Sequence, residues 1–79
     1  MSSEEKLRFF KTAIKEGAVS ISEVAHLSGM RRQTVSAMAK KTERPSEYNV
    51  SRVYDATKKA IDSRRRAISN TFKEASSNG

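Results

Sequence analysis

The stretch ISEVAHLSGMRRQTVSAM, residues 21–38, decides the fold of this chain. Gly29 divides the stretch, because a sharp turn between two helices needs a residue that can adopt a positive φ. Ala25, four residues earlier, lets two helices cross closely where a larger side chain would push them apart. The remaining apolar residues stand at fixed distances from the turn and are expected to point inward: Val24, Met30, Val35 and Met38. Together these constraints predict two short helices joined by a tight turn.

Capping signals mark the helices on the amino-terminal side of the turn. Ser20 followed by Glu23 has the spacing of a capping box, which starts the first helix of the pair. Ser3 is placed to cap an earlier helix, which Gly17 ends. This region therefore contains one helix before the pair.

The later part of the chain is expected to be helical as well. Asn49 is placed to cap a helical stretch after a polar connection, and Asp62 and Ser63 either break that stretch or lie within one continuous helix. Nothing in the chain is typical of a strand. The sequence predicts an all-α fold, a compact bundle of about five helices, with these approximate bounds: 4–16, 21–28, 32–41, 50–62 and 63–75.

Composition limits the class of protein. A chain of 79 residues is one domain, and with no cysteine it has neither disulfides nor thiolate metal ligands. Its apolar runs are far shorter than a membrane span, and its start does not have the order of a signal peptide. The composition therefore predicts a soluble cytoplasmic protein.

The positive charge is concentrated in the middle of the sequence. The net charge is +7, and residues 29–66 carry eleven basic against four acidic side chains, while the segments on either side are balanced. A localised basic excess is typical of proteins that bind a polyanion.

With this geometry, residues 21–38 resemble the helix-turn-helix family, in which the second helix enters the DNA major groove. The run from Gln33 to Ser36 is similar to the recognition helix of lac-repressor-type headpieces, and the order of helices is similar to the lambda repressor and Cro proteins. Arg31 departs from the headpiece pattern, which has a small hydroxyl residue there as a cap, and Ala37 replaces a long polar residue. The resemblance implies a small phage- or plasmid-type regulator without a small-molecule effector domain, acting in a bacterial or phage-infected cell at the nucleoid.

The resemblance also implies which side chains contact DNA. Base contacts are expected from the start and outer face of the second helix: Arg31, Arg32, Gln33, Ser36, Ala37 and Lys40. Phosphate contacts are expected from residues around it: Ser20, Ser22, Thr34, Lys41, Arg44, Tyr48, Asn49 and Arg52.

The expected function is sequence-specific binding of double-stranded DNA by a transcriptional regulator, a repressor that binds a palindromic operator as a homodimer. The segment 61–75 is expected to form the dimer interface through Ile61, Ile68, Phe72 and Ala75. Two alternatives remain: an accessory factor in recombination or partition, and a basic helical protein-interaction module.

The sequence gives no support for metal binding, cofactor binding or catalysis. His26 is the only histidine and lacks a cysteine or an obvious carboxylate partner, so we expect no metal, no cofactor and no enzymatic activity. The arginine triplet 64–66 is either a solvated face or an additional contact to the DNA backbone.

Overall fold

The computed structural model describes residues 1–40 and 45–77, with side chains up to residue 73. This part of the chain is all-helical, as predicted, and contains four helices rather than five. Their bounds are α1 Ser3–Lys15, α2 Ile21–Ser28, α3 Arg32–Lys40 and α4 Glu47–Ser77.

Local signals start and end the first helix. Ser2, not Ser3, is the N-cap of α1, and its hydroxyl accepts a hydrogen bond from the Glu5 backbone N–H at 3.2 Å. The predicted cap was wrong by one residue, because either serine can provide the hydroxyl. Gly17 follows the helix with φ of 76°, as its position predicted.

The turn between α2 and α3 has the predicted chemistry. Ser20 and Glu23 form the capping box at the start of α2, and Gly29 ends the helix with φ of 69°. The Met30 backbone N–H then donates to the Ala25 carbonyl at 3.2 Å and closes the turn. The chain thus changes direction within a few residues and α3 starts at Arg32.

The last two predicted helices are one helix. α4 begins before Asn49, because the Ser46 hydroxyl accepts a hydrogen bond from the Asn49 backbone N–H at 3.2 Å and acts as the cap expected of Asn49. The helix continues through Asp62 and Ser63, since neither residue removes a backbone donor or favours positive φ. Of the two alternatives that the sequence left open at residues 62–63, the structure has the continuous helix, so the separate bounds 50–62 and 63–75 were wrong.

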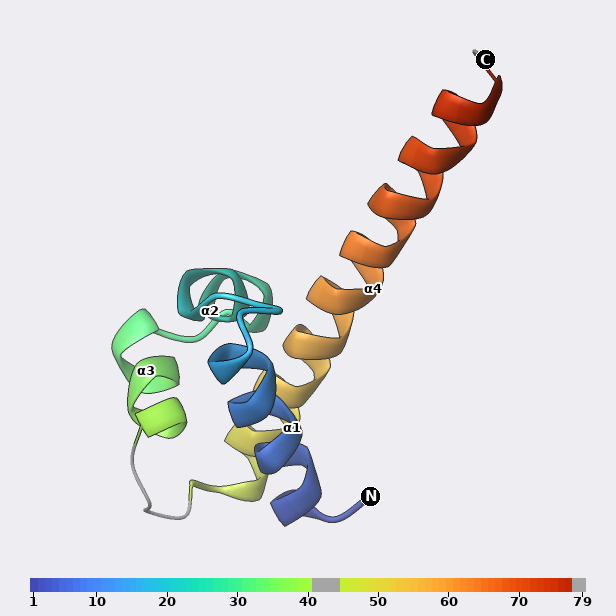
Figure 1. The fold of residues 1–79 in the computed structure, drawn as a ribbon. Coiled ribbons are helices and arrows are strands. Elements are labelled where there is room, and N and C mark those ends of the chain that lie inside the picture. The colour runs from blue at the N-terminus through green and yellow to red at the C-terminus, as the bar shows by residue number, and fades with distance from the viewer. Residues whose placement is uncertain (41–44, 78–79) are drawn as a thin grey trace.

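The core lies between the first half of α4 and the three short helices (Figure 1). α4 packs against α1 and α2, and α3 packs against α2 and α1. Four large apolar side chains at its centre are inaccessible to solvent: Phe10, Val24, Val35 and Val53. We call this body, up to Ile61 of α4, the head.

The second half of α4 projects from the head as a single helix, so the molecule measures 52 × 24 × 19 Å along its principal axes (Figure 1). All described side chains from Asp62 to Lys73 are exposed. No helix in the described ranges is long and apolar enough to cross a lipid bilayer.

Candidate nucleic-acid interface

The outer face of α3 brings most of the predicted base-contacting residues together. Val35 and Met38 are buried and fix the inner side of the helix against the core. On the other side, five residues line one open, shallow hollow: Arg32, Gln33, Ser36, Ala37 and Lys40. These side chains are therefore positioned by a helix whose rotation is set by the core.

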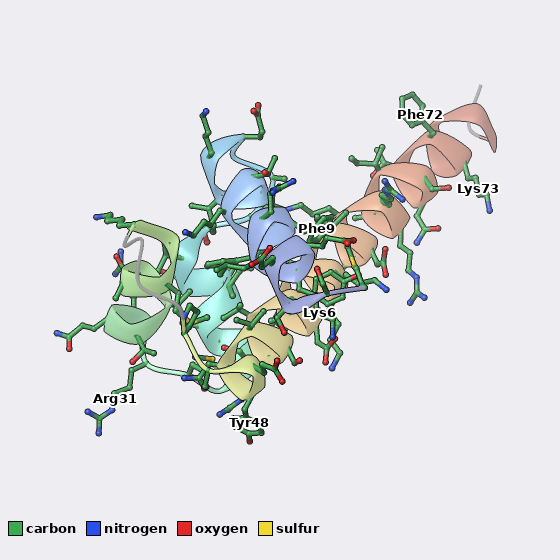
Figure 2. The ribbon with its side chains drawn as sticks, turned by 90° about the horizontal axis from the view of Figure 1, so that it is seen from below. Lys6, Phe9, Arg31, Tyr48, Phe72 and Lys73 are labelled. Atoms are coloured by element: carbon green, nitrogen blue, oxygen red, sulfur yellow. The ribbon has the colours of Figure 1, made fainter. Side chains whose placement is uncertain are left out.

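Arg31 stands at the start of this surface. Its carbonyl accepts the hydrogen bond of the Val35 backbone N–H at 3.1 Å, so it occupies the position immediately before α3. A guanidinium has no acceptor and cannot cap the backbone N–H groups of the first turn. Its exposed side chain extends away from the ribbon in Figure 2. No acidic residue occurs between Arg31 and Lys40, so the surface has one sign of charge.

The residues predicted to contact phosphate lie on several elements. Ser22, Thr34 and Tyr48 are exposed, and Asn49 is half-buried in the first turn of α4. The Ser20 hydroxyl already accepts from the Glu23 backbone N–H at 3.1 Å, which leaves its own hydrogen available as a donor. Lys41 and Arg44 lie outside the described residues.

Arg52 has an internal partner that the sequence did not indicate. Its Nη2 donates to the Ser28 carbonyl at 2.6 Å, and the guanidinium carbon lies 5.4 Å from the centre of the Tyr48 ring. A carbonyl in the last turn of a helix has no partner within the helix, so Arg52 satisfies one such group of α2. A Cβ on Gly29 would lie 3.3 Å from this nitrogen, so a larger residue there would require the guanidinium to shift slightly. Arg52 therefore stabilises the turn that precedes α3.

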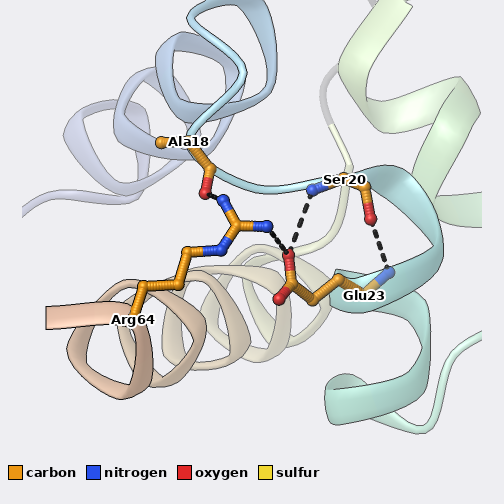
Figure 3. A network of polar contacts seen from close by, with 4 residues as sticks. All are labelled: Ala18, Ser20, Glu23 and Arg64. Carbon is orange, nitrogen blue, oxygen red and sulfur yellow. Dashed lines mark hydrogen bonds and ion pairs between the residues drawn. The ribbon is translucent and has the colours of Figure 1, made fainter. Parts of the chain in front are cut away.

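Arg64 joins the middle of α4 to the start of α2 (Figure 3). Its Nη1 donates to the Ala18 carbonyl and its Nη2 to Glu23 Oε1 at 2.9 Å. The same carboxylate oxygen accepts from the Ser20 backbone N–H at 3.3 Å. Arg64 is thus hydrogen-bonded to the head. This role differs from both roles expected for the arginine triplet, a solvated face and a contact to the DNA backbone.

The spacing of the buried residues of α4 indicates in the sequence that Arg64 lies next to the head. Residues 50, 53, 57 and 60 of α4 are buried at alternating intervals of three and four, and residue 64 is the next position in this row. An arginine there extends its aliphatic stem along the head and carries its charge to the rim.

Arg64→Ala is expected to lower the free energy of unfolding by about 1 kcal/mol, because it removes two charge-assisted hydrogen bonds at a half-exposed site. For a domain of this size the melting temperature should fall by about 4–8 °C in calorimetry. Arg66→Ala is the matched control, since Arg66 is exposed two residues further along α4. Equal losses in the two variants would contradict the role given to Arg64.

The predicted dimer residues are only partly accessible. Ile61 is half-buried and packs against the core, whereas Ile68 and Phe72 are 58% and 70% exposed. The side chain of Ala75 lies outside the described part of the structure.

The described residues contain no group of three or more His, Cys, Asp or Glu side chains that could hold a metal ion. The surface that collects the predicted site residues is the open outer face of α3. Comparison of the chain with protein-family models, with curated proteins and with solved structures found no match.

Proposed function

We propose that the chain binds double-stranded DNA sequence-specifically, with α3 as the helix that enters the major groove. One observation carries this proposal: α3 is fixed on its inner side by Val35 and Met38 and presents Arg32, Gln33 and Lys40 on one open surface. Arginine can donate two hydrogen bonds to guanine, and glutamine can pair with adenine through its amide. An exposed helix held by the core thus has suitable groups for reading bases.

The surroundings of α3 support contacts to the DNA backbone. Arg31 and Tyr48 are exposed, and so are Ser22 and Thr34 near the starts of α2 and α3. Such groups position a protein on the duplex without selecting the sequence. The excess of basic residues adds an affinity that falls as the salt concentration rises.

We further propose that the protein is a homodimer that represses transcription from a palindromic operator, at the nucleoid of a bacterial or phage-infected cell. A single short recognition helix buries little surface, and two related helices read half-sites about one helical turn apart. The exposed Ile68 and Phe72 on the projecting half of α4 support self-association.

Selection of bound sequences from random double-stranded DNA tests this function. A palindromic consensus is the expected result. Retardation of no duplex at low salt would contradict DNA binding and favour a protein-interaction module. A footprint over several adjacent direct repeats would contradict the palindromic operator and favour an accessory role in recombination or partition.

Arg32→Ala and Gln33→Ala should each weaken binding to the selected sequence by about 1–3 kcal/mol, or roughly 5- to 150-fold, because each removes a bidentate base contact. Binding to random DNA should change much less. Fluorescence anisotropy with both duplexes measures the two affinities. Arg8→Ala, which removes an exposed arginine from α1, is the control and should affect both duplexes equally. Equal losses on both duplexes for Arg32→Ala would assign Arg32 to phosphate instead.

A further inference from the structure

The projecting half of α4 lacks the packing that normally stabilises a helix. Every described side chain from Asp62 to Lys73 is exposed, and isolated helices of about 15 residues are marginally stable in water. The segment nevertheless carries two large apolar side chains, Ile68 and Phe72. A packing partner along this segment would bury them.

These apolar side chains form a stripe on one side of the helix. Ile61, Ile68 and Phe72 are separated by seven and four residues, which places them on the same face. Ile68 and Phe72 also line one shallow hollow together with Ala67 and Thr71. Ile68 and Phe72 therefore form one apolar patch, and Ile61 lies on the same face of the helix at the edge of the head.

We infer that this stripe binds the same stripe of a second copy of the chain, with the two α4 helices antiparallel. The inference rests on the homodimer of the proposed function and specifies its geometry. The register brings Ile68 of the two copies together and places Arg65 of each copy level with Thr71 of the other, one residue from Phe72.

Charge selects the antiparallel orientation. Arg65 lies beside the stripe between Ile61 and Ile68, so a parallel pair in register would bring its guanidinium against that of the second copy. Two like charges in a partly desolvated contact are unfavourable. In the antiparallel register each guanidinium instead lies one helix rise, about 1.5 Å, from the level of Phe72 of the other copy, so that its long side chain can reach the aromatic ring in a favourable cation–π contact. The stripe is therefore complementary to itself, as a two-fold interface requires.

This orientation also positions the two heads. The buried row of α4, which includes Val53 and Ala60, lies about a fifth of a turn from the stripe. The two-fold axis of an antiparallel pair is perpendicular to both helices. Each head packs on the buried row, which lies to one side of the stripe, and the two-fold axis therefore places both heads on the same side of the pair. Recognition of two half-sites on one face of a duplex needs such an arrangement.

Distances between spin labels test the orientation without DNA, so the result is independent of DNA binding. The chain has no cysteine, and Asp55→Cys and Asp62→Cys each introduce one labelling position on the same exposed side of α4. Each residue rises 1.5 Å, so the antiparallel register predicts about 40 Å between labels at residue 55 and about 20 Å at residue 62.

Pulsed electron paramagnetic resonance at about 100 μM protein measures both distances. A parallel pair would give nearly equal, short distances at the two positions and would overturn the antiparallel assignment. Absence of a dipolar signal in both variants would overturn self-association. Phe72→Glu in the Asp55→Cys background is the control and should abolish the signal. Sequence-specific DNA binding would still be judged by the Arg32 and Gln33 variants.

Discussion

Replacing Phe10 with alanine is expected to lower the free energy of unfolding by about 3–5 kcal/mol. The Phe10 ring has no solvent exposure and belongs to the core between α1 and α4. A chain of this size has a total stability of only about 4–12 kcal/mol. The variant should therefore lose a large share of its stability. If the total stability of the chain is at the lower end of this range, the variant should be unfolded at room temperature.

Thermal and urea unfolding followed by circular dichroism measure this loss. Phe9→Ala is the matched control, since Phe9 is half-buried and packs edge-on against Tyr54 with 5.4 Å between ring centres. The smaller buried area should limit its loss to less than half that of Phe10→Ala. If both variants lost the same stability, Phe10 would not occupy the centre of the core.

Phe72→Glu is expected to give a monomer that binds a palindromic operator about 10²- to 10⁴-fold more weakly than the original chain. The carboxylate would have to be desolvated in the apolar stripe, so the pair should separate. Loss of the pair removes the simultaneous binding of two half-sites, whose contribution through effective concentration is of this size. The fold of the head should be unchanged, because Phe72 is 70% exposed.

Analytical ultracentrifugation gives the oligomeric state, and titration of a palindromic duplex gives the affinity. Asn70→Glu makes the same change in charge on the opposite side of α4 and should leave both unchanged. A Phe72→Glu variant that sediments as a dimer would remove this residue from the interface. A monomer that keeps full operator affinity would show that dimerisation does not contribute to DNA binding.

The short helices could be predicted closely because their ends depend on nearby residues. The capping box at Ser20 and the glycine at position 29 determine the ends of α2 within a few residues of chain. The outer face of α3 followed from the inward positions of Val35 and Met38, since a helix that buries one side exposes the other. The residues gathered on that face were therefore accessible to sequence reasoning.

The structural roles of two arginines could not be predicted in the same way. The hydrogen-bond partners of Arg52 and Arg64 include the Ser28 and Ala18 carbonyls, which are 24 and 46 residues away in the chain. Backbone carbonyls are the same at every position, so nothing in the sequence marks them as partners. The sequence left open whether α4 continues through Asp62, because a polar residue at an exposed helix position resembles a loop.

The dependence of the core on α4 has a consequence for synthesis on the ribosome. The amino-terminal helices α1 and α2 obtain much of their packing from α4, which supplies Val50, Val53 and Ala60 to the core. A nascent chain that has emerged only to residue 45 exposes the apolar sides of α1 and α2 that α4 covers in the folded protein. Domains commonly fold as units during synthesis, so the head of this protein should fold only after the first half of α4 has left the exit tunnel.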